Sequence, residues 1–259
     1  NELEYPKTLT LIIQVPAEAQ ADSGDGVANE GANATIAGLR GISRAAEEIM
    51  IARDIVLAET LGAKVHIAHV STAGGVELIR EAKQRGVRVT CETCPHYFSA
   101  TDEEILSYNT NAKINPPLRE QSDCEAIIDG IRDGTIDVIA TDHAPHTREE
   151  KNREFDLAPF GTVGFETALS LAYTYLAETG VIGMPGIVKL MSHNPSRLLG
   201  LPVVSIKPGA MADVTVFDPE CEWTVRADEL SSKSKNCLYD GWRLKGKVIH
   251  TIVGGELKC

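Results

Sequence analysis

The stretch Asp137-Val138-Ile139-Ala140-Thr141-Asp142-His143-Ala144-Pro145-His146 decides how the fold of this 259-residue chain is interpreted. Its β-branched part, Asp137–Thr141, predicts a short strand, and Asp142 stands at the carboxyl end of that strand. A carboxylate in such a place can bind a metal and take a proton from a metal-bound water. Equally, Asp142 could do no more than cap the following turn.

Outward from this stretch, short apolar segments alternate with helical ones. Strands are predicted at Leu9–Val15, Lys64–Val70 and Val87–Thr93, and helices at Ser43–Leu61, Gly75–Arg85, Val163–Glu178 and Ile187–Ser192. Ser43 and Gly62 are expected to cap the first helix, and Ser122 with Glu125 forms a capping-box pattern for a helix ending near Gly134. Strands that alternate with helices imply parallel βα units with right-handed crossovers. Beyond Gly200, the segment Ile206–Cys259 predicts a small all-β appendage.

Two further segments present side chains suited to a site. In Val65–Ser71, strand alternation predicts that His66 and His69 point to opposite faces, with His69 at the strand end where barrel enzymes keep their active sites. Taken alone, His69 would more often be a structural or surface residue. Asn115 precedes two prolines that fix the backbone, so its amide could meet an imide or amide ring, or simply mark a loop.

Composition narrows the function classes. The net charge of −12 argues against nucleic-acid binding and against a polybasic membrane contact. No apolar run is long enough to cross a bilayer, and the first residues lack the pattern of a signal peptide. The six cysteines are interpreted as reduced thiols of a cytoplasmic protein. The pair Cys91 and Cys94 is discounted as a zinc or redox motif because residues three apart in a strand face opposite ways.

Together these stretches resemble the type I dihydroorotases of the amidohydrolase superfamily, from about Tyr5 to the last residues. The matching motifs are Gly41–Glu48, His66–Thr72, Asn115–Arg119, Thr141–His146, Ala158–Gly161, Asn194–Ser196 and Trp242–Val248. The resemblance implies a (β/α)₈ barrel with a small β-sandwich. It also implies reversible, zinc-dependent cyclisation of N-carbamoyl-aspartate to dihydroorotate in pyrimidine biosynthesis.

The resemblance also implies roles for individual residues. His69 matches a zinc ligand, and Asp142 matches a residue that binds zinc and shuttles the proton. Asn115 and His146 match residues that hold the ring and carboxylate of the substrate. Phe160 and Gly161 match a loop whose backbone contacts the substrate, while His66 and His143 match motif positions without an assigned ligand role.

The chain departs from the family pattern in two places. It contains no His-x-His pair, and Pro16 stands where the fifth strand of the family carries a ligand histidine. By matching, the chain corresponds to about strands 5–8 of a partial TIM-type barrel at residues 1–200, followed by a C-terminal β-sandwich portion at residues 201–259. We therefore expect a fragment of a longer protein or a decayed paralogue, with only His69 and Asp142 left as ligands.

Two alternatives stay open at this stage. A hydantoinase, dihydropyrimidinase or allantoinase would share the barrel and act on a related cyclic amide. A non-catalytic, dihydroorotase-like scaffold that associates with aspartate transcarbamoylase would explain Pro16. The expected partners are a small-molecule substrate, possibly aspartate transcarbamoylase, and further copies of the chain in a homo-oligomer.

Overall fold

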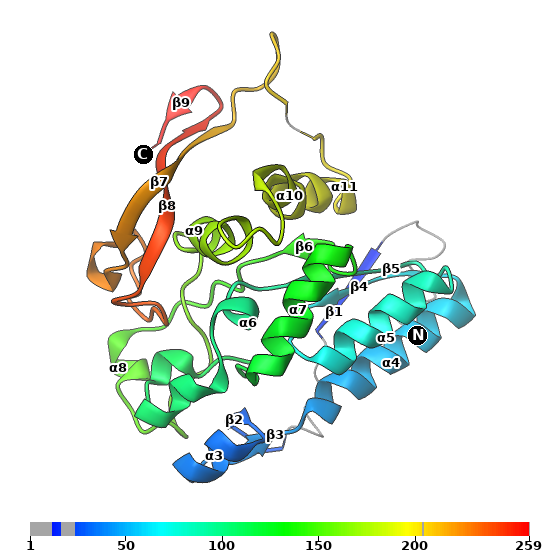
Figure 1. Cartoon of the computed structure of the whole chain (residues 1–259), viewed down its shortest axis with the longest axis vertical. Coiled ribbons are helices and arrows are strands. Elements are labelled where there is room, and N and C mark those ends of the chain that lie inside the picture. Colours follow the sequence, from blue (N-terminus) through cyan, green and yellow to red (C-terminus); the bar gives the residue numbers. More distant parts are fainter. Residues whose placement is uncertain (1–11, 17–23, 204, 259) are drawn as a thin grey trace.

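The computed structural model describes residues 12–16, 24–203 and 205–258 (Figure 1). Its centre is a four-stranded parallel sheet in the order β1-β4-β5-β6. The strands are β1 (Ile12–Pro16), β4 (Lys64–Ala68), β5 (Val89–Thr93) and β6 (Val138–Ile139). The prediction of an α/β chain with parallel strands is confirmed, although β4, β5 and β6 are shorter than predicted. The part of the predicted first strand before Ile12 lies outside the described residues.

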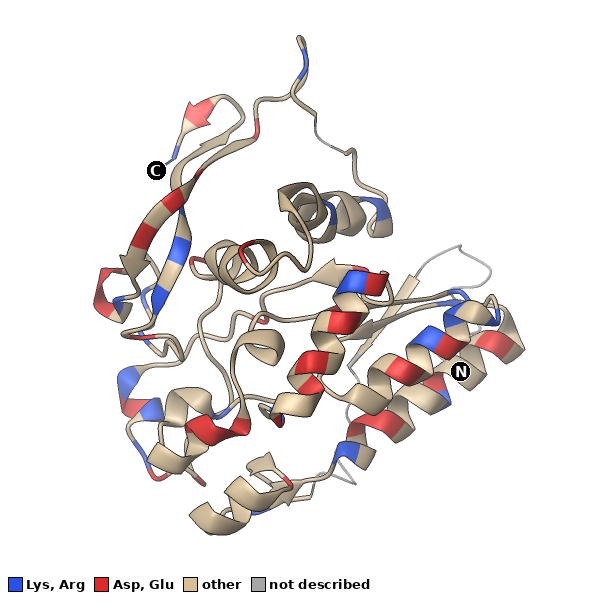
Figure 2. Cartoon of the chain, in the orientation of Figure 1, with Lys and Arg blue, Asp and Glu red and all other residues tan. Residues whose placement is uncertain are grey.

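Three long helices lie against this sheet and connect its strands: α4 (Arg44–Leu61), α5 (Ala73–Gln84) and α7 (Gln121–Asp133). Local signals set the ends of α4, because the Ser43 hydroxyl accepts from the backbone of Ala45 and Gly62 adopts φ 59° after the last turn. Figure 2 shows acidic residues spaced along α7. The apolar sides of these helices and the sheet form the largest core cluster, which includes Ile51, Ile67 and Ile127.

The predicted capping box at the start of α7 is wrong. The helix begins at Gln121, so Ser122 lies inside the first turn and the capping position falls to Glu120, which makes no side-chain cap. The carboxylate of Glu120 instead accepts from Arg44 at 2.7 Å. The predicted end of the helix at Gly134, which has φ 81°, is confirmed.

Short elements fill the space around the sheet. They are β2 (Ala28–Asn29), α3 (Ala32–Ala37), β3 (Gly41–Ile42), α6 (His96–Ser99), η1 (Asp102–Ser107), η2 (Thr110–Ala112) and α8 (Arg148–Lys151). The predicted helix at Val163–Glu178 is present from Ala168 as α9 (Ala168–Ala172) and the π-helical η3 (Tyr173–Ala177). The predicted helix at Ile187–Ser192 is longer than expected and comprises α10 (Met184–Val188), η4 (Lys189–His193) and α11 (Asn194–Leu198).

The C-terminal segment forms a three-stranded antiparallel sheet in the order β7-β8-β9. Its strands are β7 (Val214–Thr224), β8 (Arg243–Val253) and β9 (Glu256–Leu257), and the short helix η5 (Ala227–Glu229) lies between β7 and β8 in the sequence. The segment thus contains an antiparallel sheet, whereas the predicted β-sandwich stays a prediction. This sheet lies beside α9 (Figure 1), and a second core cluster joins Leu171 to Leu238, Tyr239 and Leu244. The division at residue 200 stays a prediction.

None of the helices in the described ranges is long and apolar enough to cross a membrane.

Candidate active site at the strand ends

The two residues predicted to bind metal, His69 and Asp142, come together in the structure. The His69 Nε2 atom lies 3.8 Å from Asp142 Oδ1, and each side chain is about one-quarter exposed. His69 follows the last residue of β4, and Asp142 lies just beyond β6, so both stand beyond the carboxyl ends of parallel strands. Two side chains that are 73 residues apart in the sequence thus lie close together.

Both residues also adopt an uncommon backbone conformation. His69 has φ 57° and Asp142 has φ 45°, and apart from Tyr108 they are the only non-glycine residues with positive φ in the described ranges. This left-handed region is costly for residues with a side chain and persists where the surrounding structure enforces it. Its occurrence at both predicted ligands marks this place as a candidate functional site.

The expectation that His66 and His69 point to opposite faces is wrong. Glu92, on β5, contacts both: its Oε2 lies 3.2 Å from His66 Nε2, and its Oε1 lies 3.1 Å from His69 Nδ1. Strand alternation applies only to an extended backbone, and β4 ends at Ala68, so the left-handed His69 turns its ring back toward Glu92.

Sequence reasoning missed Glu92. The signal available was a carboxylate within the otherwise uncharged strand Val89–Thr93, where the structure leaves it only 7% exposed. A carboxylate on His69 Nδ1 fixes the ring orientation and directs Nε2 toward Asp142. Burial raises the pKa of Asp142, the neighbouring His69 opposes this rise, and the charge of Glu92 adds to it.

The discounted cysteines are both buried. Cys94 Sγ lies 3.4 Å from His69 Nδ1, on the same side of the ring as Glu92. Burial raises the pKa of the Cys94 thiol well above its usual value, and the nearby carboxylates of Asp142 and Glu92 raise it further. A protonated thiol is a weak metal ligand, which agrees with discounting Cys94 as part of a zinc motif.

The candidate substrate residues His146, Phe160 and Gly161 also meet. His146 Nε2 donates to the carbonyl oxygen of Phe160 at 2.8 Å, and a Cβ on Gly161, which has φ 136°, would lie 3.2 Å from His146 Cδ2. The backbone of Gly161 donates to the carbonyl of Lys113 at 2.8 Å, two residues before Asn115. His143, in contrast, accepts from the backbone of Gly164 at 3.1 Å and stacks on Phe165.

Two buried lysines lie beneath the loop that carries Phe160 and Gly161. Lys113 is 3% exposed and Lys151 is 5% exposed. Burial lowers the pKa of Lys113, with the charge of Asp156 opposing it. Burial, together with the positive charge of Lys113, lowers the pKa of Lys151 from 10.5 to about 8. Neither lysine forms an ion pair with a carboxylate among the described residues.

We predict that the lowered pKa of Lys151 makes stability rise with pH. Between about pH 8 and 10.5 the unfolded chain binds a proton at Lys151 that the folded chain does not, so raising the pH favours folding. From pH 7 to 9.5 this contribution amounts to about 2 kcal/mol. Urea unfolding at pH 7 and pH 9.5 should show that the free energy of unfolding increases more in the wild type than in Lys151→Met and Lys151→Arg. The methionine and arginine side chains do not titrate in this pH range. Equal pH slopes in all three proteins would contradict it.

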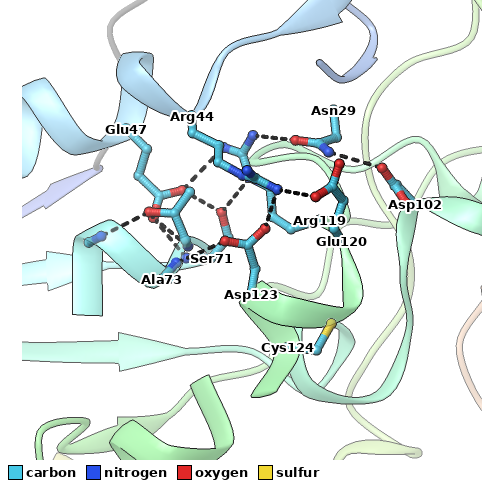
Figure 3. A network of polar contacts seen from close by, with 12 residues as sticks. Asn29, Arg44, Glu47, Ser71, Ala73, Asp102, Arg119, Glu120, Asp123 and Cys124 are labelled. Carbon is cyan, nitrogen blue, oxygen red and sulfur yellow. Dashed lines mark hydrogen bonds and ion pairs between the residues drawn. The ribbon is translucent and has the colours of Figure 1, made fainter. Parts of the chain in front are cut away.

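A network of polar contacts, centred on Arg44, Glu47 and Arg119, includes Ser71, which follows His69 by two residues (Figure 3). The carboxylate of Glu47 accepts from the backbone and hydroxyl groups of both Ser71 and Thr72, the residues that follow the β4 strand end. Arg119 lies 3.4 Å from Glu47 and also donates to Asn29 Oδ1 at 2.9 Å. The network therefore ties the end of the Asn115 loop to the segment after His69.

The side chains present fit part of a zinc site. Two ligands on one tetrahedral zinc lie roughly 3.4 Å apart, close to the 3.8 Å between His69 Nε2 and Asp142 Oδ1. Imidazole and carboxylate are both ordinary zinc ligands. Within the described ranges, however, no group of three or more His, Cys, Asp or Glu side chains could hold a metal. These two residues would hold zinc only with further donors from outside the described residues.

Comparison with known proteins places this geometry in a family. The amidohydrolase family model matches residues 14–258. The chain is 50% identical over 256 residues to the dihydroorotase of Caldanaerobacter subterraneus, covering 99% of this chain and 59% of the relative. It is 52% identical over 255 residues to that of Pelotomaculum thermopropionicum, covering 98% of this chain and 60% of the relative.

Solved structures show the same fold at lower identity. The dihydropyrimidinase from Brevibacillus agri superposes with a TM-score of 0.86 at 24% identity, covering 99% of this chain and 58% of that chain. The L-hydantoinase from Arthrobacter aurescens gives a TM-score of 0.85 at 24% identity, with coverage of 98% and 58%. The chain thus spans about three-fifths of the length of the proteins it matches, and it belongs to the amidohydrolase family.

Proposed function

We propose that this chain supplies the His69 and Asp142 part of the zinc-dependent site of a dihydroorotase, with dihydroorotate and N-carbamoyl-aspartate as substrates. The observation that carries the proposal is the meeting of these two side chains, both on left-handed backbone, at 3.8 Å beyond the ends of parallel strands. The names of relatives that are 49–52% identical over nearly the whole chain support dihydroorotase in particular.

The proposed architecture is the second half of a (β/α)₈ barrel. The four parallel strands and the helices α4, α5 and α7 that connect them provide about strands 5–8 of such a barrel. Both edge strands of this sheet, β1 and β6, pair on one side only among the described residues. The fold likeness to a dihydropyrimidinase, of which this chain covers 58%, supports this arrangement.

Different residues of this chain would have different roles in the hydrolysis of a cyclic amide. Zinc, when bound, supplies a hydroxide nucleophile near neutral pH and polarises the amide carbonyl. Asp142 would accept the proton and pass it to the leaving amide nitrogen through its carboxylate. Glu92 would keep the His69 ring oriented. Asn115, His146 and the backbone of Phe160 and Gly161 would bind the ring and carboxylate of the substrate.

The test is turnover of dihydroorotate by the zinc-supplemented chain, beside hydantoin and allantoin. We expect hydrolysis of dihydroorotate to N-carbamoyl-aspartate and no comparable reaction with the other two, because a site matched to a substrate carboxylate loses that contact with an uncharged ring. Preferred hydrolysis of hydantoin would instead assign the chain to the hydantoinases.

A non-catalytic scaffold is the second candidate, and the register of β1 favours it. Pro16 pairs with Ala68, the residue directly before His69, so the position counted as a family ligand lies beside the site and carries a residue that cannot bind metal. Such a scaffold would bind aspartate transcarbamoylase. Co-purification with that enzyme, without zinc and without turnover, would support the scaffold, whereas tightly held stoichiometric zinc would exclude it.

A further inference from the structure

The buried ammonium groups of Lys113 and Lys151 both donate hydrogen bonds to the loop from Phe155 to Gly161. Lys113 Nζ donates to the carbonyl oxygens of Phe155 at 2.9 Å and Asp156 at 3.0 Å. Lys151 Nζ donates to those of Pro159 at 2.8 Å and Gly161 at 3.0 Å. Four backbone carbonyls of one seven-residue loop therefore point at two cations.

This arrangement is not explained by stability alone. A buried ammonium group without a carboxylate partner costs free energy, and an apolar side chain of similar volume would fill the same space at lower cost. The two lysines also repel each other, which contributes to the lowered pKa of Lys151. What the cations provide, and an apolar side chain cannot, is a fixed inward direction for the loop carbonyls.

The same two residues connect the loop to the neighbouring walls of the candidate site. The Lys113 carbonyl accepts from Gly161, and the Lys113 ammonium lies 4.7 Å from the centre of the Phe160 ring. The Lys151 carbonyl accepts from Thr110 at 2.6 Å. The Phe160 carbonyl also accepts from His146. The positions of the Phe160 ring, the Phe160 backbone and His146 therefore depend on one another.

We propose that Lys113 and Lys151 are positioning residues that clamp the Phe155–Gly161 loop into the conformation that binds the substrate. The clamp sets the distance between the Asn115 segment and the Phe160–Gly161 backbone. It acts on the binding of a carboxylate-bearing cyclic amide rather than on the reacting atoms. The substrate part of this inference rests on the proposed function, whereas the clamp itself does not.

Hydrogen exchange tests the clamp without any need for turnover. The amides of Leu157, Ala158 and Gly161 donate to backbone carbonyls and should exchange slowly in the wild type. In Lys113→Met and Lys151→Met we expect their exchange to accelerate by about tenfold or more, because the loop loses two of its four inward contacts. Unchanged exchange in these folded variants would overturn the clamp.

The matched control is Lys83→Met. The Lys83 ammonium also donates to a backbone carbonyl, that of Thr135 at 2.7 Å, but it lies on α5 away from the loop. This variant should leave the exchange of residues 155–161 unchanged.

If Lys151→Met does not fold, Lys151→Gln, which retains an amide donor, takes its place. That variant should accelerate loop exchange less than Lys113→Met, and equal acceleration by Lys83→Met would overturn the inference.

Kinetics test the link to the substrate. Lys113→Met and Lys151→Met should raise KM for dihydroorotate by about tenfold while changing kcat less. Lys151→Arg, which keeps a positive charge, should raise KM less than Lys151→Met does. A fall in kcat at constant KM would overturn the positioning role. Accelerated loop exchange in a chain that does not bind dihydroorotate would leave the clamp standing and remove the proposed function instead.

Discussion

Replacing Arg119 with methionine is expected to destabilise the chain by about 3–5 kcal/mol, because it removes one partner of a buried ion pair. Arg119 and Glu47 are each about 2% exposed, and their closest nitrogen–oxygen distance is 3.4 Å. Arg119 also donates to Ser71 Oγ, to Asn29 Oδ1 and to the backbone of Ile42. Methionine fills much of the same volume, but it leaves the buried charge of Glu47 without its cation and removes one donor from each of these acceptors.

Thermal unfolding measures the effect directly, and a loss of this size lowers the Tm by roughly 6–20 °C for a chain of this length. Arg132→Met is the matched control, because Arg132 is more than half exposed and pairs with Asp129 on the surface of α7. That change should cost less than about 1 kcal/mol. Combining Arg119→Met with Glu47→Gln should be less destabilising than the sum of the two single changes, since they share one interaction. Strict additivity would show that the two side chains are not coupled.

The contacts of Glu47 show where sequence reasoning reaches its limit. From the sequence, its place in the first turn of a helix suggests an interaction with the helix dipole. In the structure it binds Ser71 and Thr72, which lie 24 and 25 residues further along the chain. Ser43 and Gly62 could be assigned correctly because caps depend on neighbours within four residues. Contacts such as that of Glu47 depend on strand order and register.

The candidate site likewise contains residues that the sequence indicates and residues that only the structure reveals. The motifs around His69 and Asp142 left each residue's role open, and only the family resemblance implied that the two bind one zinc. The structure brings their side chains to 3.8 Å, and the shared metal site stays a proposal. The partners that orient them were not predictable, because Glu92 comes from the neighbouring strand and acts through a left-handed turn at His69. Lys113 and Lys151 were missed for a similar reason: their partners are backbone carbonyls of a loop, which leave no trace in side-chain patterns.

Replacing Asp142 with asparagine is expected to lower turnover of dihydroorotate by a factor of about 10²–10⁴, the usual range for a group that transfers a proton in the reaction. Asparagine keeps the size of the side chain and one oxygen toward His69 Nε2, 3.8 Å away in the wild type, but it cannot carry the proton. Zinc affinity should fall as well, because a neutral amide oxygen replaces a carboxylate ligand.

Comparison with Glu92→Gln separates the two effects of this change. The Glu92 carboxylate contacts His69 Nδ1 at 3.1 Å and does not reach the reacting atoms except through that ring. Its loss should weaken zinc binding by about 10–100-fold, and excess zinc should restore much of the turnover. Excess zinc should not restore Asp142→Asn, because the missing proton carrier is not replaced by metal. Asp129→Asn, an exposed change on α7, should alter neither quantity. If saturating zinc rescued Asp142→Asn completely, Asp142 would be a ligand only, and the proton would have to travel by another group.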